Sequence, residues 1–420
     1  MSSPLKRPFP SLSVRNFRLF AAGQVLSATG TWMMVVAQDW LVLSLTDNSA
    51  TTLGAVTALQ FAPLLLTLYG GRLADRHDKR LLLTVANLAS GALALPLALL
   101  VLTDTVRLWH ICLFALGLGL VNAVEVPTRM AFVSELVGGD LLPNASALSA
   151  AYFNAARVIG PALAGLLITG LGTGWVMLLN AVSYLATVAG LRMMRPSEMH
   201  RGAERDARPR VVDGLRHVVE RGDLAPVLVL VAVVGLFGMN FQLTLPLLAK
   251  TVFHSDAASF GLLTAGFAAG SLLAAFATSA RRGRPSGALV AGSALAFGVL
   301  ETLAGAAPTT TAAVVLLCLT GFAAIYFVQA ANHRVQLGSD PRYRGRVMAL
   351  YTLILQGSTP IGSLVVGEVT ERLGARPGLW LGGLVSLTAG GLALLHVRRT
   401  ERARRPEERR LPVDEPVVRP

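Results

Sequence analysis

Long apolar runs divide this chain into segments that are each long enough to cross a lipid bilayer. One run extends from Thr52 to Gly70, and the next resumes at Leu81 after a short charged turn. At about 1.5 Å per residue, a helix of about 20 residues covers a hydrocarbon core about 30 Å thick. Twelve runs of this kind follow one another: about 17–43, 52–70, 81–102, 108–127, 145–169, 175–194, 225–249, 258–280, 287–306, 311–333, 347–369 and 378–396. The pattern predicts an all-α membrane protein with twelve transmembrane helices.

The charge content agrees with a membrane location. Of the 420 residues, 53% are hydrophobic and 15% are charged, whereas soluble domains contain about 25% charged residues. The net charge of +13 falls in short blocks between the apolar runs. This distribution is typical of the loops of a membrane protein and argues against a nucleic-acid partner.

The basic residues also predict the orientation. If the runs cross the membrane alternately, 32 of the 37 Lys and Arg residues lie on the side that holds both termini. Four lie in the loops on the other side, and Arg157 lies inside a run. Because cytoplasmic loops are enriched in Lys and Arg, we expect a multi-pass protein of the cell membrane with both termini in the cytoplasm.

An internal repeat divides the twelve runs into two groups of six. When the chain is shifted by 202 residues, Gly119 aligns with Gly321 and Asn154 with Gln356. Several further glycines match at the same offset, which predicts two pseudo-symmetric six-helix bundles. The expected organisation is a tail (1–16), an N-terminal bundle (17–194), a central loop (195–222), a C-terminal bundle (223–397) and a tail predicted to be disordered (398–420).

The turn between the second and third runs has a characteristic order of residues, Gly71 followed by RLADRHDKR. It resembles the signature loop of the major facilitator superfamily, G-x-L-a-D-r-x-G-r-r, with Asp78 in place of the second glycine. In that family the loop holds one conformation by bridging to neighbouring helices, and Asp75 can sit against a helix N-terminus. The resemblance implies a conformational latch made by Gly71, Asp75, Arg76, Arg80 and Arg129; an ordinary basic turn is the alternative.

Runs four and five carry a second resemblance, in Pro127-Thr128-Arg129 and in the segment from Asn154 to Gly165. They are similar to the enterobactin-exporter-like branch of the superfamily, which is related to drug:proton antiporters. Gly160, Pro161 and Gly165 resemble the antiporter motif, in which glycine allows close helix packing and proline kinks the helix. A packing kink without a transport role is the alternative. The charged residue that antiporters usually carry in span four is missing between Leu113 and Gly119.

Arg157 lies deep inside a predicted span, whereas every other Lys or Arg lies in a connection, in a tail or within two residues of the end of a span. A charge at that depth is costly unless it faces a partner, water or a cavity. At helical spacing it shares a face with Asn154, Pro161 and Gly165, so we expect it to point into the bundle. It would then bind a polar or anionic substrate group or partner a titrating carboxylate; a fixed tie to Glu125 or to a backbone carbonyl is the alternative.

Asp39, Glu125 and Arg157 are the candidates for proton coupling. Carboxylates in a low-dielectric environment bind protons more readily than they do in water, which suits a group driven by a proton gradient. Asp39 lies in span one beside a polar stripe, although it could instead cap or pair near the outer surface. Glu125 precedes Arg129 by four residues, so a salt bridge within the helix is the alternative for it. Glu301 and Glu368 are expected to be solvated near the outer interface.

The polar residues of the spans predict a substrate cavity. In the superfamily, spans one, four, seven and ten line the central cavity, and polar side chains here occupy those spans and span five. Hydrogen bonds between helices are the alternative use for these amides. The predicted cavity residues are Gln24, Thr31, Gln38, Asn122, Asn154, Arg157, Asn240, Gln242, Gln329 and Asn332.

Several function classes are excluded by what the sequence lacks. There is no phosphate-binding P-loop, and no segment between the spans is large enough for an ATPase domain. Catalytic and metal-ligand clusters are also missing, and Cys112 and Cys318 lie inside apolar runs where packing is the expected role. We therefore expect a transporter and not an enzyme, without a cofactor or nucleotide, powered by an ion gradient.

These observations converge on a secondary active transporter that works by alternating access. The predicted reaction is proton-coupled export of a small amphipathic organic molecule, such as a drug, a siderophore or a secreted metabolite. The expected partners are that substrate and the lipid bilayer, and the expected state is a monomer. An importer or facilitator on the same scaffold is the main alternative, and a non-transporting membrane receptor or enzyme is a remote one.

Overall fold

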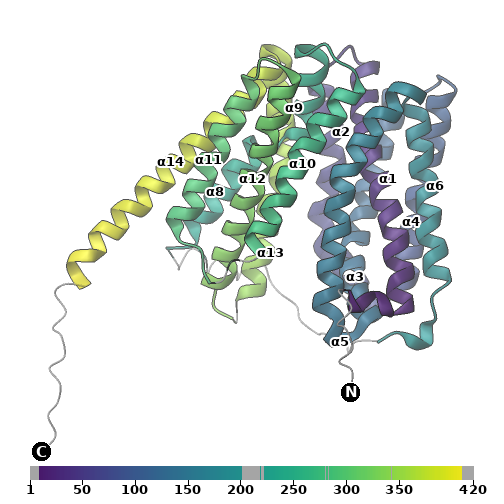
Figure 1. Ribbon diagram of the computed structural model, residues 1–420, viewed down its shortest axis with the longest axis horizontal. Coiled ribbons are helices and arrows are strands. Elements are labelled where there is room, and N and C mark those ends of the chain that lie inside the picture. Colours follow the sequence, from purple (N-terminus) through teal and green to yellow (C-terminus); the bar gives the residue numbers. More distant parts are fainter. Residues whose placement is uncertain are drawn as a thin grey trace, which may run out of the picture.

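The computed structural model describes residues 9–200, 218, 222–279, 281, 283–341 and 343–408, with the side chains of Leu68 and of 401–408 left out. Most of the predicted tails and central loop (1–8, 201–217, 219–221 and 409–420) therefore lies outside the described residues. Within them the chain is helical and forms two bundles that stand side by side (Figure 1).

The N-terminal bundle is built from six long helical segments, some of them bent. A short 3-10 helix at Pro10–Ser13 precedes the first of them, and another at Ala62–Leu66 joins α2 to α3. The helices are α1 (Arg15–Leu45), α2 (Ala50–Phe61), α3 (Thr67–Arg76), α4 (Lys79–Leu102), α5 (Leu108–Leu171) and α6 (Thr173–Arg192), followed by a 3-10 turn at Pro196–Glu198.

The C-terminal bundle repeats this arrangement. Its first span is broken between α8 and α9 and ends in a π-helical turn at Leu248–Val252. The helices are α8 (Ala225–Phe237), α9 (Phe241–Leu247), α10 (Ala257–Ser279), α11 (Gly287–Gly305), α12 (Thr310–Gly338), α13 (Arg344–Leu373) and α14 (Ala375–Glu408). The first eleven residues of the tail predicted to be disordered, from Arg398 onward, therefore continue α14 as helix.

The described ranges account for all twelve predicted spans. Ten helical stretches are long and apolar enough to cross a membrane on their own, and the bent pair 50–66 and 69–76 makes an eleventh. The 64-residue α5 holds two of the predicted spans, because its backbone breaks at Gly138 with φ 71°. Glycine adopts this left-handed conformation without the steric cost of a side chain. The connection between spans four and five, predicted as a loop, is thus helical on both sides of one break.

The turn around Gly71 differs from its prediction. Helix α3 continues through Gly71 and ends only at Arg76, so the turn is limited to His77 and Asp78. Asp78, and not Asp75, caps the next helix by accepting a hydrogen bond from the backbone N–H of Leu81 at 2.9 Å. Asp75 is exposed and does not supply this cap, so its placement against the N-terminus of another helix stays a prediction.

The two bundles are related as the repeat predicts. Spans five and eleven both end at a glycine with positive φ, Gly172 at 88° and Gly374 at 100°, which are 202 residues apart. Between the bundles, α5 packs against α10 and α2 packs against α13. These two crossings are equivalent under the repeat, since each joins the second span of one bundle to the fifth span of the other.

Close glycine contacts bring these crossing helices together. A Cβ on Gly54 of α2 would lie 2.4 Å from the carbonyl oxygen of Ser363 on α13. A Cβ on Gly261 of α10 would lie 2.3 Å from the carbonyl oxygen of Pro161 on α5. No larger residue fits at either position, so small residues let the helix backbones approach, as they do in other membrane bundles.

The two ends of the molecule differ. We call the end where α1 begins and α14 finishes the terminal end, and the other the opposite end (Figure 1). At the opposite end, the Glu371 carboxylate of α13 accepts hydrogen bonds from the N–H groups of Ala50 and Thr51 and from the hydroxyl of Ser49. The ammonium of Lys250 donates to the hydroxyl of Ser44 at 3.1 Å. These contacts join the two bundles at the opposite end.

Candidate functional site

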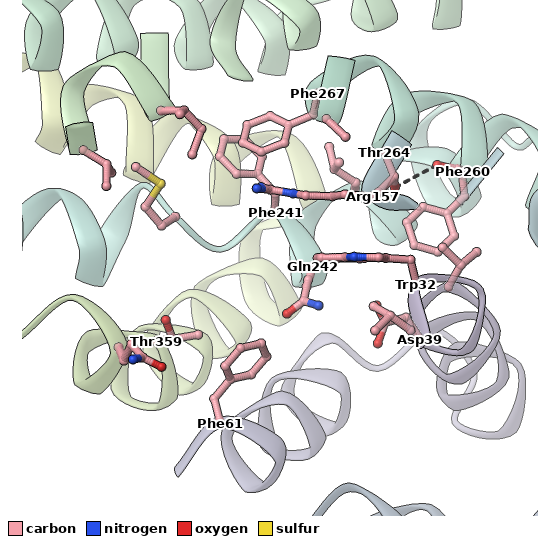
Figure 2. A pocket seen from close by; sticks show the side chains of 18 of the residues that line it. Trp32, Asp39, Phe61, Arg157, Phe241, Gln242, Phe260, Thr264, Phe267 and Thr359 are labelled. Atoms are coloured by element: carbon pink, nitrogen blue, oxygen red, sulfur yellow. Dashed lines mark hydrogen bonds between the residues drawn. The ribbon is translucent and has the colours of Figure 1, made fainter. Parts of the chain in front are cut away.

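A cavity of about 330 Å³ lies between the two bundles. Its wall is formed by α1, α2, α5, α9, α10, α12 and α13 together with Met239, so both halves of the chain contribute (Figure 2). Most of the wall is apolar, and much of it is aromatic. The aromatic residues are Trp32, Phe61, Phe241, Phe260 and Phe267; the polar and charged ones are Asp39, Arg157, Gln242, Thr264, Gln356 and Thr359.

Asp39 and Arg157 are the two charged residues of this wall. Asp39 is 3% exposed, and its Oδ2 atom has no hydrogen-bond partner among the described residues. The guanidinium of Arg157 lies 5.6 Å from the centre of the Trp32 ring, a cation–π contact. In the view of Figure 2, the Trp32 ring lies between Arg157 and Asp39. A free carboxylate and a free guanidinium therefore face the same cavity.

The predicted tie between Arg157 and Glu125 is not present in the described structure. Glu125 instead pairs with Arg129 on the same helix at 3.0 Å, which confirms the salt bridge considered for it. Arg129 also stacks over Phe153, with the guanidinium 4.2 Å from the ring centre. Because Glu125 pairs with Arg129, its carboxylate does not bind Arg157, and the Arg157 side chain lines the cavity.

The antiporter-like residues pack helices against one another around Arg157. A Cβ on Gly160 would lie 2.6 Å from the Cβ of Trp32, so the glycine admits the α1 backbone and its tryptophan. Pro161 and Gly165 lie against α10, where Gly261 and Ala257 approach them. The segment thus places Trp32 beside Arg157 and holds α5 against the other bundle. Whether it also serves transport stays a prediction.

Of the ten predicted cavity residues, the structure places Arg157 and Gln242 in the cavity wall. Three of the others bond to nearby backbone carbonyls: the side chains of Thr31, Asn154 and Asn240 donate to the carbonyls of Ser27, Ala150 and Leu236. The buried Oδ1 atom of Asn240 has no hydrogen-bond partner among the described residues. Gln38 is 1% exposed and donates to the side chain of Gln60 at 3.0 Å. The remaining four lie outside this wall, Gln24 buried and Asn122, Gln329 and Asn332 half-buried.

The aromatic and hydroxyl residues of the wall escaped the sequence analysis, although signals for some of them exist. Phe260, Thr264 and Phe267 recur at helical spacing on α10 and share one face. Thr359 is the repeat partner of Arg157, and Gln356 is the repeat partner of Asn154. Adding 202 to the number of each candidate in the first half would have identified Thr359 and Gln356 as candidates in the second half.

A second cavity, of about 290 Å³, lies nearer the terminal end. It shares Gln356 with the central cavity and extends along α13 to Met348 and Gly345 in the first turn of that helix. Leu64 and Thr67 line its other side. Cavity space therefore lies on the terminal side of the central cavity, whereas Glu371 and Lys250 hold the bundles together at the opposite end.

The predicted latch residues lie at the terminal end in different environments. Asp75 and Arg76 are exposed, and a Cβ on Gly71 would meet no atom within 4 Å. Arg80 donates to the carbonyls of Leu191 and Arg192 at 2.7 and 3.1 Å, which ties α4 to the end of α6. Their role as a latch stays a prediction.

One ion pair in this region was not predicted. The ammonium of Lys79 lies 2.6 Å from the carboxylate of Glu135, and both side chains are about 85% buried, with 16% and 15% exposed. It joins the start of α4 to the part of α5 before Gly138. The turn thus contacts its neighbours through Lys79 and Arg80.

Two further expectations are settled by burial. Glu301 was expected to be solvated but is 3% exposed, because α11 turns this side chain towards α14 and the end of α8. Glu368 is exposed, as predicted, and pairs with Arg372 on the same helix.

Cys112 and Cys318 are free and half-buried. Among the described residues, no group of three His, Cys, Asp or Glu side chains could hold a metal ion.

A family model described as transmembrane secretion effector matches residues 6–419 of the chain. The chain belongs to this family of the major facilitator superfamily. The resemblance seen in the sequence is confirmed, and so is the twelve-helix fold class. The protein is a multi-pass membrane transporter of small molecules and not an enzyme.

Curated relatives are similar to the transporter at modest identity. The staphyloferrin A transporter of Staphylococcus aureus is 28% identical over 61% of this chain, and the match spans 65% of that relative's length. The multidrug efflux pump Tap of Mycolicibacterium fortuitum is 26% identical over 85% of this chain and 89% of its own length. The macrolide efflux protein A of Streptococcus pyogenes is 22% identical over 88% of this chain and 92% of its own.

Solved structures share the fold. A bacterial homologue of the human lysosomal transporter Spinster superposes with a TM-score of 0.72 at 14% identity, over 93% of this chain and 97% of that one. A bacterial homologue of the iron transporter ferroportin superposes with a TM-score of 0.67 at 16% identity, over 92% and 98%. At these identities the likeness concerns the fold alone.

Proposed function

We propose that this transporter exports a small amphipathic organic molecule from the cytoplasm in exchange for protons. The observation that supports the proposal is the wall of the central cavity, which combines many aromatic rings with one buried carboxylate and one guanidinium. Aromatic faces bind amphipathic ligands through their apolar area, and a few polar groups fix the orientation of the ligand. The efflux and siderophore relatives are compatible with a ligand of this kind.

Asp39 is the proposed proton carrier. A buried carboxylate without a hydrogen-bond partner is costly when ionised, so it favours the protonated form until a partner or water reaches it. Arg157 lies in the same wall and would stabilise the ionised form if the two side chains approached. The proton and the substrate would then compete for the same cavity, so that each binds when the other has left, which is the requirement for exchange.

The basic residues and the position of the second cavity support entry of the substrate from the cytoplasm. If the Lys- and Arg-rich terminal end faces the cytoplasm, the second cavity lies on the cytoplasmic side of the central one in this conformation. Substrate would enter there, and a rocking movement of the bundles would expose it on the other side. Such alternating access needs the contacts at Glu371 and Lys250 to open in turn.

Inside-out membrane vesicles test this function. We expect a macrolide, ethidium or staphyloferrin A to accumulate in vesicles that are acidic inside, and the accumulation to stop when the proton gradient is collapsed. Asp39→Asn should abolish gradient-driven accumulation yet allow exchange of labelled for unlabelled substrate, since only the coupling step is lost. Glu368→Gln, a matched change on an exposed carboxylate, should retain both activities.

Two outcomes would contradict the proposal. Accumulation in right-side-out vesicles at the expense of the gradient would identify an importer. Full gradient-driven transport by Asp39→Asn would remove Asp39 from the coupling step. Labelling of His77→Cys by a membrane-impermeant maleimide checks the orientation independently, because this exposed residue should react only from the cytoplasmic side.

A further inference from the structure

Glu301 lies inside the C-terminal bundle, outside the wall of the central cavity. Its side chain is 3% exposed, and its Oε2 atom has no hydrogen-bond partner among the described residues. Ionising an isolated carboxylate at such a site costs several kcal/mol or more, because burial removes the hydration of the charged form. A natural chain keeps such a group only where it has a use, or where it is neutral.

The surroundings of Glu301 contain hydrogen-bond acceptors. Its Oε1 atom and the carbonyl oxygen of Phe237 both lie 2.6 Å from the point that a Cβ on Gly382 would occupy, so the two oxygens are within about 5 Å of each other. The hydroxyl of Ser386, one turn further along α14, is also buried and without a partner. An ionised carboxylate would be repelled by this carbonyl, whereas a protonated one is a donor beside it.

In the described part of the chain, no basic residue is in place to neutralise Glu301. Helix α8 carries no titratable side chain. On α14, Arg376 donates to the carbonyls of Gly305 and Ala307 at the end of α11, and the other basic residues lie near the far end of that helix. The titratable residues of α12 lie further towards the terminal end: Cys318, Tyr326, His333 and Arg334. Protonation is therefore the available way to remove the charge.

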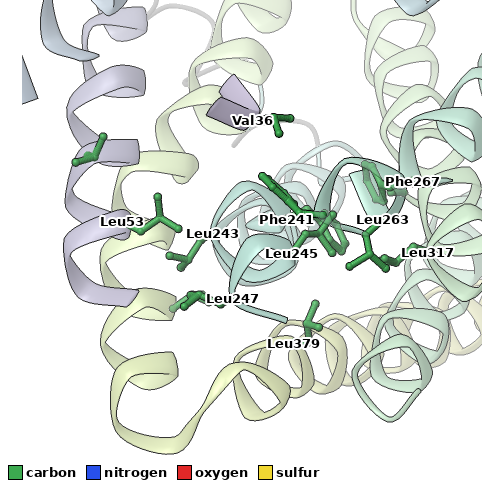
Figure 3. Close-up of a cluster of buried hydrophobic side chains, with 14 of the residues drawn as sticks. Val36, Leu53, Phe241, Leu243, Leu245, Leu247, Leu263, Phe267, Leu317 and Leu379 are labelled. Carbon is green, nitrogen blue, oxygen red and sulfur yellow. The ribbon is translucent and has the colours of Figure 1, made fainter. Parts of the chain in front are cut away.

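The position of Glu301 links it to the central cavity. Phe237 is the last residue of α8, where span seven breaks before α9. The Phe237 carbonyl accepts a long hydrogen bond, 3.3 Å, from the side chain of Asn240. Met239 in the break and Phe241 and Gln242 at the start of α9 line the cavity, and α9 packs in the core shown in Figure 3. A charge at Glu301 would act on the hinge that positions these residues.

We propose that Glu301 is a second proton-binding site, and that its proton holds the break between α8 and α9 in the arrangement seen here. A proton from water binds the carboxylate, and the resulting O–H can donate to a neighbouring acceptor such as the Phe237 carbonyl. Loss of the proton leaves a buried anion beside that carbonyl and loosens the break. Glu301 lies one turn from the end of α11 at the opposite end, the side from which an exporter takes up protons. The proposal that Glu301 takes up its proton from the opposite end during export rests on the proposed function; the binding of the proton does not.

Infrared spectroscopy of the protein in lipid nanodiscs tests the proton directly. At neutral pH we expect a C=O band of protonated carboxylic acid that contains a component from Glu301. Glu301→Gln should remove this component, and Asp39→Asn should leave it in place. Glu368→Gln should leave the spectrum unchanged. A spectrum that Glu301→Gln does not alter would overturn the proposal, and so would a component that responds to sodium and not to acid. The infrared band and its response to acid can be measured without transport activity. Failure of this proposal can therefore be distinguished from failure of the export proposal.

Hydrogen–deuterium exchange tests the hinge. After correction for intrinsic rates, exchange of the segment 238–247 should increase by about three- to tenfold between about pH 6 and about pH 9 in the wild type, because the ionised site loosens the break. In Glu301→Gln the corrected rate should not change with pH. A pH response retained in that variant would contradict the role of Glu301.

A measurement on the unaltered chain guards against a variant that does not fold. Dicyclohexylcarbodiimide modifies protonated carboxyl groups in apolar surroundings, and mass spectrometry locates the modified residue. We expect modification of Glu301 that declines as the pH rises, with none at the exposed Glu368. Modification that spares Glu301 at every pH would count against a protonated site there.

Discussion

At the scale of single residues, the distinction that matters is between polar groups that are satisfied locally and those left free. Thr31 and Asn154 donate to carbonyls of their own helices, and neither lies in the cavity wall. Asp39 has an unpartnered oxygen atom, and Arg157 has a tryptophan face instead of a carboxylate. In a membrane, where water is scarce, a free polar group marks a functional position more reliably than polarity alone.

The Lys79–Glu135 pair allows a quantitative prediction at this scale. Both side chains are about 85% buried at a distance of 2.6 Å, so their attraction is less screened than at the surface. We expect a double-mutant cycle of Lys79→Ala and Glu135→Ala, measured by unfolding in detergent, to give a coupling free energy of about 1–2 kcal/mol. The matched pair Arg195–Glu198, 63% and 41% exposed, should give less than about 0.5 kcal/mol. Equal values for the two pairs would show that burial does not strengthen the first.

At the scale of helices, small residues decide which elements cross between the bundles. Gly54 and Gly261 bring α2 to α13 and α10 to α5 at distances that exclude a Cβ. The breaks in α5 at Gly138 and between α8 and α9 then direct the side chains that follow them. Helix packing and helix interruption together place Arg157 and Gln242 in one wall.

Substitution of Gly54 tests this packing. Gly54→Ala places a methyl group against the backbone of Ser363, and we expect it to destabilise closure of the opposite end by about 1–3 kcal/mol. The readout is labelling of Thr264→Cys in the cavity by an impermeant maleimide applied from the opposite side, in a chain without Cys112 and Cys318. Labelling should become faster. Gly292→Ala, on α11 with no atom within 4 Å, should not change it, and equal effects of the two would refute the packing argument.

At the scale of the whole molecule, the contacts between the bundles define the conformation. Glu371 of one bundle accepts hydrogen bonds from the first turn of α2 in the other, where the free N–H groups and the helix dipole favour an anion. The two bundles are pseudo-symmetric, yet this contact occurs once among the described residues, at the opposite end. It therefore stabilises one state of the transport cycle selectively.

Removal of Glu371 should shift that equilibrium. Because the side chain is exposed, we expect Glu371→Ala to cost the closed arrangement about 1 kcal/mol, which is about a fivefold change in population. Electron-paramagnetic distance measurements between spin labels at Asp47 and Leu373 should show a larger fraction of long distances. Glu368→Gln, one turn earlier on the same helix, should leave the distribution unchanged. An unaltered distribution in Glu371→Ala would exclude it as a gate.

The sequence by itself determined the number of spans, the repeat and the family of this transporter, because bilayer thickness imposes a run length and family motifs are local in the chain. It also identified Asp39, Arg157 and Gln242. Only the tertiary structure decided which of the other polar residues meet: the burial of Glu301, the Lys79–Glu135 pair and the aromatic cavity wall all depend on contacts between helices distant in the chain. A helix has several faces, and the partner that each face receives is set by packing between elements, which no single segment encodes.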